Sequence, residues 1–459
     1  MSADPIPAFP PGQADADLLL YNALVLTLET GAPPISGGYV AVTGSRIGAV
    51  GSAAAGPDLP VARQSLDLHG SLVMPGLVNT HCHAPMVWFR GLADDLPLQS
   101  WLQDFIFPAE GAWLNAERAY WGTLLAAAEM IRGGITTVAD GYFYASEVRR
   151  ALAEAGLRAV AAQGVVDFPA PGVPDPRNNL QVAADFLDTG AEFSPQGVTS
   201  AIFCHSPYTC GAETLARAKE LSRARGVPLF LHLAETAGEV EEMRHRTGLT
   251  PTAYLDRLGV LDELTVAVHA VWLTPDDQEI LARCGVKVSH CPESNLKLAS
   301  GVAPIPELLA AGVTVGLGTD GAGSNNNLDL WGELSLAARL HKVWHLDPTL
   351  LPAAQAVALA TREGARVLGL DGCTGTITPG QEADLIVLDL DRPHLTPLYD
   401  PFSHLAYAAR AADVRHVMAR GRWLLYDRRL TTLDWPEIAA RVRWDSRSLA
   451  ISCQNRRRP

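Results

Sequence analysis

The chain has 459 residues, of which 48% are hydrophobic and 19% are charged, so it is long and apolar enough to bury a sizeable core. Its formal net charge of −14 argues against a nucleic-acid partner, because such surfaces need clustered positive charge. The sequence shows no secretory signal and no run of about 18 apolar residues that would span a membrane. The seven cysteines are scattered and odd in number. We therefore expect reduced thiols in a cytoplasmic protein that has no membrane partner.

Strand-like runs occupy both ends of the chain. After a proline-rich leader, short apolar runs are punctuated by Gly and Pro, as in a β-meander. Similar runs return near the other end, for example in GTITPGQEADLIVLDLD. We expect residues 1–73 and 372–459 to pair into a β-sandwich that flanks the middle of the chain.

The middle of the chain, residues 74–371, alternates apolar runs with segments of helical periodicity. One such segment, AERAYWGTLLAAAEMIRGG, has apolar residues at helical spacing and ends in Gly-Gly. The alternation predicts an α/β fold, a distorted (β/α)8 TIM-type barrel, with a doubly wound open sheet as the alternative. The eight predicted strands lie in LVMPGLVNTHCH, ITTVADGY, RAVAAQGVVD, VTSAIFCHS, PLFLHLAE, TVAVHAVW, VKVSHCP and VTVGLGTD.

Polar residues follow the apolar runs where each predicted strand ends. In VNTHCHAP, His81 and His83 are one residue apart, so both side chains point to the same side, about 7 Å apart at Cα. Taken alone, this pair reads equally well as polar residues leaving a strand. The carboxyl ends of barrel strands meet at one rim, however, so we expect all such residues to converge. The others are His205, His232, Glu235, His269, His290 and Asp320.

Three imidazoles and one carboxylate form a suitable shell for a divalent cation. We expect His81, His83, His232 and Asp320 to bind Zn²⁺, with Fe²⁺ as the competing metal. Binuclear hydrolases often bridge two ions with a carboxylated lysine on the fourth strand. No lysine precedes Lys219 in this chain, so we expect one metal ion per chain.

The remaining polar residues at the rim suit proton transfer. Glu235 follows a predicted ligand by three residues, and we assign it the proton shuttle; the alternative is a surface glutamate that opens the next helix. His269 is expected to polarise water or stabilise developing charge. Asp320 is expected to accept a second proton in addition to binding the metal. The role of His290 is left open between support of the site and a structural role.

The string GLGTDG, residues 316–321, matches the dinucleotide-binding pattern G-x-G-x-x-G. That pattern requires a helix to open at the glycines, whereas AGSNNNLDLW reads as a polar loop before a helix. We therefore expect these glycines to let the backbone pack closely around Asp320, rather than to bind a nicotinamide cofactor.

Several strings resemble the amidohydrolase superfamily, and more narrowly the 5-methylthioadenosine/S-adenosylhomocysteine deaminases, in the group that also holds the triazine hydrolases. The resemblance implies a zinc-type barrel that converts an adenine nucleoside to its inosine analogue and ammonia. The nucleoside would be 5′-methylthioadenosine, adenosine or S-adenosylhomocysteine. Water would add at C6 of the purine while Glu235 protonates N1. The matching strings are PGLVNTHCHAPMVWFRGLADDLPLQSWL, FPAEGAW, CHSPYTC, HLAET, SHCPESNLKLASG and GLGTDGAGSNNNLDLWGE.

The same resemblance implies substrate contacts. Glu110 in FPAEGAW would accept hydrogen bonds from the ribose hydroxyls, which a carboxylate can do. The alternative for Glu110 is an acidic residue favoured by a helix N-terminus. His205 in CHSPYTC would contact the nucleoside. Trp88, Trp101 and Phe105 are candidates for the apolar wall around the base, although each alone reads more readily as core.

The chain departs from the family at one place. Members that use S-adenosylhomocysteine can hold its amino-acid carboxylate with an arginine near the third strand, where this chain has Gln163. We therefore expect weaker use of that substrate, unless Arg158 or Arg177 supplies the contact. The resemblance also implies a small-molecule nucleoside as partner and a homo-oligomer, either dimer or tetramer.

Three alternatives remain open from the sequence. The first is a deaminase of another heterocycle, such as guanine, a pterin or a triazine; Glu110 argues for a ribosyl substrate instead. The second is a noncatalytic metal-binding barrel. The third is amide-ring hydrolysis of the dihydroorotase kind, which normally requires two metal ions.

Overall fold

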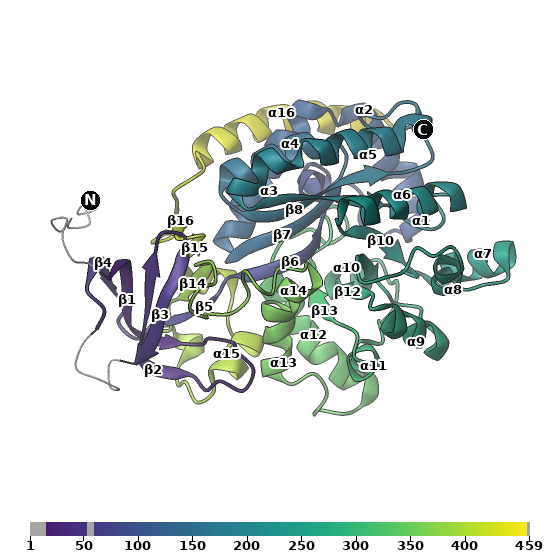
Figure 1. Ribbon diagram of the computed structural model, residues 1–459. Coiled ribbons are helices and arrows are strands. Elements are labelled where there is room, and N and C mark those ends of the chain that lie inside the picture. Colours follow the sequence, from purple (N-terminus) through teal and green to yellow (C-terminus); the bar gives the residue numbers. More distant parts are fainter. Residues whose placement is uncertain (1–14, 53–58, 457–459) are drawn as a thin grey trace.

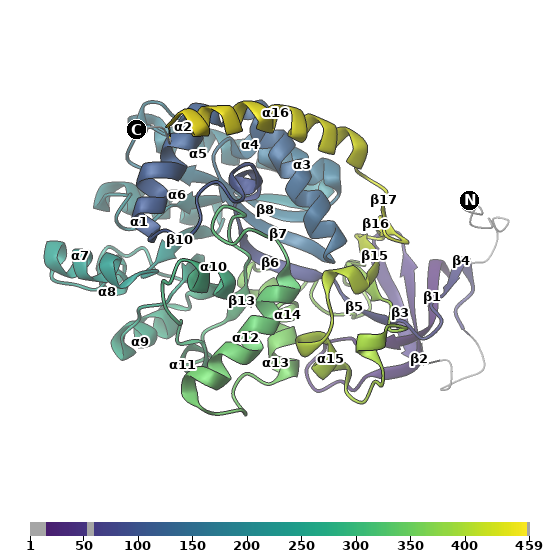
Figure 2. The ribbon, with the colours of Figure 1, turned by 180° about the vertical axis from the view of Figure 1, so that it is seen from behind.

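The computed structural model describes residues 15–52 and 59–456, and the proline-rich leader lies almost wholly outside this range. Figure 1 shows a large barrel with its surrounding helices beside a smaller sheet, which contains strands from both ends of the chain. The long C-terminal helix α16 (Trp435–Arg456) leaves the small sheet and runs across the outside of the barrel, as Figure 2 also shows.

Eight parallel strands form the barrel, and each falls within one of the eight predicted runs, so the predicted fold class is confirmed. The strands follow one another in sequence order around the sheet. The ring closes where Asp320 N donates to His81 O at 3.1 Å, next to a bridge between Cys82 and Asp320. The strands are β6 (Leu77–Cys82), β7 (Ile135–Tyr142), β8 (Arg158–Val165), β9 (Val198–Cys204), β10 (Leu229–Leu233), β11 (Thr265–His269), β12 (Lys287–His290) and β13 (Val315–Leu317).

Helices between the strands cover the outer face of the barrel (Figures 1 and 2). None of the helices in the described ranges is both long and apolar enough to cross a bilayer. The helices of this part are α1 (Leu98–Ser100), α2 (Phe107–Trp113), α3 (Ala116–Arg132), α4 (Ala145–Ala155), α5 (Asn179–Asp188), α6 (Ala212–Arg225), α7 (Ala237–Thr247), α8 (Pro251–Arg257), α9 (Pro275–Cys284), α10 (Pro292–Lys297), α11 (Ile305–Ala310), α12 (Leu330–His345), α13 (Ala353–Leu359) and α14 (Arg362–Val367).

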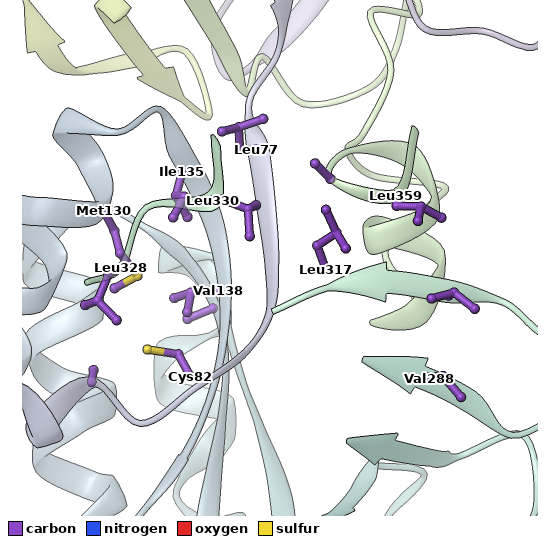
Figure 3. Close-up of a cluster of buried hydrophobic side chains, with 14 of the residues drawn as sticks. Leu77, Cys82, Met130, Ile135, Val138, Val288, Leu317, Leu328, Leu330 and Leu359 are labelled. Carbon is purple, nitrogen blue, oxygen red and sulfur yellow. The ribbon is translucent and has the colours of Figure 1, made fainter. Parts of the chain in front are cut away.

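Side chains that alternate along each strand fill two separate layers. In β8, Val160 and Ala162 belong to the cluster inside the barrel, whereas Ala159 and Ala161 belong to the cluster between barrel and helices. Figure 3 shows part of the outer cluster, where Leu77 and Val138 of neighbouring strands lie near Met130 of α3. This packing fixes which strand residues face the interior and therefore which side chains can reach the rim.

The two chain ends pair as predicted, and together they form one mixed sheet. Strand β5 joins the ends, because it pairs antiparallel with β14 and parallel with β1. The order is β17-β16-β15-β14-β5-β1-β2-β3, with β4 also on β1, and α15 (Pro401–Tyr407) lies in the same C-terminal part. The strands are β1 (Ala16–Val25), β2 (Ile35–Thr43), β3 (Arg46–Ser52), β4 (Ala62–Asp67), β5 (Leu72–Pro75), β14 (Leu385–Leu388), β15 (Val414–Ala419), β16 (Arg422–Tyr426) and β17 (Arg429–Leu430).

Gly76 is the junction between the small sheet and the barrel. The run SLVMPGLV, which reads as a single strand, divides here into β5 and β6, and Gly76 N donates to Asp384 O at 2.9 Å. A Cβ atom at Gly76 would lie 2.1 Å from Thr136 Oγ1. Only glycine therefore fits the approach of β5 to the start of β7.

Replacing Gly76 with alanine is expected to lower the free energy of unfolding by about 1–3 kcal/mol, because the added methyl group overpacks a buried junction. Gly372→Ala is the matched control, since a Cβ there meets nothing within 4 Å. Thermal or denaturant unfolding of both variants checks the expectation. Equal stability of the two variants would contradict it.

Candidate metal centre and active site

Imidazole and carboxylate groups from opposite sides of the barrel meet at its carboxyl rim. His81 Nε2 and His83 Nε2 each lie 3.3 Å from Asp320 Oδ1, and His232 Nε2 lies 3.4 Å from His81 Nε2. Zinc–ligand distances of about 2.0–2.1 Å give tetrahedral edges of about 3.3–3.4 Å. The separations between these donor atoms therefore match neighbouring ligands of a single ion.

His269 completes the convergence. Its Nε2 lies 4.0 Å from Asp320 Oδ2 and 3.8 Å from Glu235 Oε2. Among the described residues, the group whose donor atoms all lie within 4.8 Å of one another is His81, His232, His269 and Asp320. His269 thus belongs to this group. His83, a predicted ligand, lies outside the group but contacts Asp320. Three histidines and an aspartate that can hold a metal ion are therefore present at the rim.

Hydrogen bonds on the far side of each ring fix how the imidazoles are presented. His83 Nδ1 lies 2.5 Å from Gly141 O, and His269 Nδ1 lies 2.8 Å from Asn295 Oδ1. Because a carbonyl oxygen can only accept, both Nδ1 atoms carry the proton, and each Nε2 keeps its lone pair for the centre of the site. Such partners orient metal-binding histidines in proteins generally.

Asp320 is held by two hydroxyl groups that were not predicted from the sequence. Ser294 and Ser324 donate to Asp320 Oδ2 at 2.7 and 2.8 Å, which leaves Oδ1 to face His81 and His83. Both serines, like Asn295, lie in strings that carry the family resemblance. The signal was present in SHCPESN and GAGSNN, but nothing in those strings shows which side chain each hydroxyl meets.

Burial sets the protonation of the site. It lowers the pKa of His81 to about 4, with the neighbouring His83 acting in the same direction, and it lowers the pKa of His232 well below its usual value. Burial would raise the pKa of Asp320, but the hydrogen bond with His81 and the nearby imidazoles outweigh it and hold that pKa well below its usual range. Neutral imidazoles and an ionised carboxylate are the forms that bind a metal.

Glu235 differs from Asp320 in its environment. Burial raises its pKa, and the nearby His269 and the hydrogen bond from Ser300 oppose this only in part. Glu239 orients the residue, because its carboxylate accepts hydrogen bonds from Ala234 N at 3.0 Å and Glu235 N at 2.8 Å. The pKa values of Asp320 and Glu235 therefore shift in opposite directions, which is the arrangement expected for acid–base chemistry.

The backbone is strained at the same place. His269 and Asp320 adopt φ of 71° and 58°, and Ala234 and Ala270 also lie in the left-handed region. Non-glycine residues held in this region cost on the order of 1–3 kcal/mol each, and such residues cluster at functional sites. The turns that re-aim His269 and Asp320 into the barrel mouth are therefore maintained by the packing around them.

The loop after β13 confirms that GLGTDG does not open a helix. Residues 318–329 form turns and irregular structure, and α12 begins only at Leu330. A Cβ atom at Gly318 would lie 2.7 Å from Ser289 Oγ and 2.9 Å from His81 Cβ. The glycine permits this close approach, so the loop carries Asp320 to the centre of the barrel mouth.

A cavity lies over these groups. Glu110 lines it from α2 and is buried, and Tyr142 Oη at the end of β7 donates to Glu110 Oε1. Burial raises the pKa of Glu110 to about 7, although the Tyr142 hydrogen bond acts in the opposite direction. His205 and Trp101 also line the cavity, and their predicted roles as a nucleoside contact and part of an apolar wall stay predictions. Tyr142 was missed, because an aromatic residue at a strand end carries no distinctive signal.

Three predicted substrate contacts are not supported by their placement. Trp88 Nε1 donates to Arg118 O at 2.7 Å, and Trp88 does not line the cavity. Phe105 does not line it either. Gln163 shares the outer face of β8 with Ala161 and donates to Gly164 O at 3.0 Å, so strand alternation turns it away from the barrel mouth.

His290 does not line the cavity. It is buried, and its ring centroid lies 5.4 Å from that of His341 of α12, on the helical side of the barrel wall. Neither ring has a hydrogen-bond partner among the described residues. His290 therefore lies between the barrel wall and α12. This placement favours a structural role for it over support of the site.

Comparisons with known proteins agree with this geometry. The model of the amidohydrolase family matches residues 72–424, and the chain belongs to that family. A 5-methylthioadenosine/S-adenosylhomocysteine deaminase from Syntrophobacter fumaroxidans is 47% identical over 438 residues, which cover 95% of this chain and 99% of the relative. A 5′-deoxyadenosine deaminase from Methanosarcina mazei is 42% identical over 419 residues, which cover 91% and 95%.

Solved structures show the same architecture. A zinc-bound adenosine deaminase from Xanthomonas campestris superposes with a TM-score of 0.92 at 37% identity, covering 95% of this chain and 99% of the other. A zinc complex of an atrazine chlorohydrolase from Arthrobacter aurescens superposes with a TM-score of 0.85 at 25% identity, covering 94% and 100%.

Replacing His232 with alanine is expected to reduce bound zinc from about one ion per chain to a small fraction, because it removes one of the ligands that a structural or catalytic zinc needs. His404→Ala is the control, since His404 lies in α15, which belongs to the C-terminal part. Elemental analysis after dialysis measures the metal. Two ions per wild-type chain would contradict a single site and favour amide-ring hydrolysis.

Proposed function

We propose that this protein is a metal-dependent hydrolytic deaminase of adenine nucleosides. It converts 5′-methylthioadenosine, adenosine or S-adenosylhomocysteine to the inosine analogue and ammonia. One observation carries the proposal: a buried glutamate of raised pKa and a group of side chains that could hold a metal ion share one cavity with a buried carboxylate suited to a ribose diol. The names of the relatives from Syntrophobacter fumaroxidans and Methanosarcina mazei support the same substrate class.

The proposed ligands of one zinc ion are His81, His83, His232 and Asp320, with His269 in reach and Fe²⁺ as an alternative metal. The residues fit such an ion because their imidazoles are buried and neutral and their carboxylate is ionised. When bound, a divalent ion at such a site supplies a water of lowered pKa as the nucleophile.

Proton transfer falls to this chain's own residues. Glu235 lies in the cavity, where its carboxylate accepts a hydrogen bond from Ser300 and its backbone N–H donates to Glu239, and burial raises its pKa. We assign it protonation of purine N1 while water adds at C6. Asp320 accepts the second proton of the added water and passes it to the C6 amino group, so that the C6–N bond breaks, ammonia leaves and C6=O forms. His269, 3.8 Å from Glu235 Oε2, stabilises the charge that develops on the oxygen added at C6.

We assign recognition of the sugar to the wall of the cavity that carries Glu110. Glu110 accepts hydrogen bonds from the ribose hydroxyls, and the Tyr142 hydroxyl fixes the orientation of its carboxylate. His205, whose ring lies 4.9 Å from that of His232, contacts the nucleoside between the sugar and the metal centre. Because Glu110 is buried, a substrate without a diol would leave it unsatisfied at a cost in binding.

The wider setting of the enzyme is proposed from its sequence. Acidic net charge and a reduced-thiol composition support a cytoplasmic enzyme with a small-molecule substrate and without a nucleic-acid or membrane partner. We further propose a homo-oligomer, dimer or tetramer.

Glu235→Gln is expected to lower kcat by about 10²–10⁴-fold and to leave zinc content unchanged, because glutamine cannot exchange the proton. Glu241→Gln, an exposed change in α7, is the control. Ammonia release from 5′-methylthioadenosine measures kcat. Unchanged turnover would remove Glu235 from its role, and a wild-type protein without any turnover would leave a noncatalytic metal-binding barrel.

Glu110→Gln is expected to raise KM for adenosine and 5′-methylthioadenosine by about 10–100-fold, since charge-assisted hydrogen bonds to the diol are weakened. Ammonia release is measured for adenosine, 5′-methylthioadenosine, guanine and a chlorotriazine. Higher wild-type kcat/KM for guanine or the triazine would favour the deaminase of another heterocycle.

A further inference from the structure

Two segments outside the barrel strands carry the side chains that hold Asp320 and His269. Ser294 and Asn295 lie in the first turns of the short helix α10, and Ser324 lies in the loop between β13 and α12. The pairing of the barrel strands therefore does not by itself fix where these two hydroxyl groups and this amide lie. A further contact has to hold the two segments together.

Glu333, in the first turn of α12, makes such a contact with both segments. Its Oε2 accepts a hydrogen bond from Glu293 N at 3.0 Å, and its Oε1 accepts one from Asn325 Nδ2 at 2.6 Å. Glu293 directly precedes Ser294, and Asn325 directly follows Ser324. One carboxylate therefore holds the residue next to each of the two serines.

The start of α10 depends on the Glu333 carboxylate, because the helix has no cap of its own. Its N-cap residue, Cys291, forms no side-chain hydrogen bond with a backbone N–H group of the helix. The first N–H groups of a helix have no partner within it, and burying one without an acceptor is costly. Ser294 and Asn295 are buried, so the chain rather than bulk water has to supply the acceptor at this helix start.

The hydrogen bonds around Asn325 fix the direction in which its amide points. Its Oδ1 accepts from Asn327 Nδ2 at 2.9 Å. Its Nδ2 donates to Thr319 O at 2.8 Å as well as to Glu333, and Thr319 directly precedes Asp320. Both oxygens of Glu333 therefore face donors. A glutamine has one acceptor and one donor group, so at position 333 it would place an NH2 group against another N–H group.

We propose that Glu333 is a positioning residue for the metal centre. It joins α10 to the loop after β13, so that the two serines keep their bonds to Asp320 and Asn295 keeps its bond to His269. Glu333 is fully buried and does not line the cavity over the metal centre, so it acts through these neighbours and does not touch a substrate. The inference rests on the proposed function and deepens its account of the metal site.

The test compares full-length wild type with Glu333→Gln and with a matched control, Asp413→Asn. Asp413 is also a buried carboxylate that accepts a backbone hydrogen bond, from Arg410 N at 2.9 Å, but it directly precedes β15 of the small sheet. Zinc affinity is measured on metal-free protein by competition with a chelating dye. Glu333→Gln is expected to weaken zinc binding by about 10–100-fold, the usual effect of losing a partner behind the ligands, whereas Asp413→Asn keeps the wild-type affinity.

Turnover and a second variant separate positioning from a general loss of stability. In zinc-saturated Glu333→Gln, kcat for 5′-methylthioadenosine is expected to fall by about tenfold with little change in KM, because Glu110 and its wall of the cavity are unaltered. Asn325→Ala breaks the same bridge from its other end and is expected to weaken zinc binding as well. The double variant is expected to bind zinc no more weakly than the poorer single variant, because both changes remove one contact.

Wild-type zinc affinity in folded Glu333→Gln would overturn the proposal, and so would losses of affinity that add fully in the double variant. If Glu333→Gln does not fold, the zinc affinity of Asn325→Ala decides in the same way. Failure of the proposed function is distinguishable, since a wild type that binds zinc but releases no ammonia would contradict the function while the zinc affinities still decide on Glu333. A wild type that binds no zinc would overturn the metal centre and the role of Glu333 together.

Discussion

The hydrogen bond that closes the barrel, from Asp320 N to His81 O, is the constraint on which the site depends. It joins the first strand to the segment that follows the eighth, and it places the Asp320 carboxylate beside the two histidines of β6. Without that closure the rim would be open between β13 and β6, and side chains separated by more than 230 residues would not share one centre. The strained φ of Asp320 and the absence of a side chain at Gly318 both serve the same approach.

Burial then gives the converging groups different chemical roles. The imidazoles become poor proton acceptors, the carboxylate of Asp320 stays ionised, and the carboxyl of Glu235, with fewer and longer contacts, retains its proton more readily. The pKa values of Asp320 and Glu235 shift in opposite directions because their neighbours differ, although both side chains are carboxylic acids. Asp320 has imidazoles and hydroxyls around it, whereas Glu235 has one distant imidazole and a weak 3.4 Å contact from Ser300.

Much of the fold and the chemistry could be predicted from the sequence, because both depend on repeated local patterns. Eight apolar runs located all eight strands, and polar residues after those runs located the rim. Predictions failed where tertiary contacts decide. Gly76 splits an apolar run that reads as one strand, because the start of β7 approaches it. Gln163 was misplaced because its strand register, set by the packing of Val160 and Ala162, turns it outward. The hydroxyls of Ser294 and Ser324 needed three-dimensional contacts to be connected with Asp320.

The chain separates its chemistry from its selectivity. The reacting groups are fixed on strand ends, where neighbouring strands and packed glycines leave little room for change. Glu110, the carboxylate suited to a sugar diol, reaches the cavity instead from the helix α2. Relatives named for different 5′ groups, a deoxyadenosine deaminase and a methylthioadenosine/adenosylhomocysteine deaminase, match this chain over the whole barrel at similar identity. The difference in the 5′ group between the names of those two relatives is therefore not expected to arise from the groups at the strand ends.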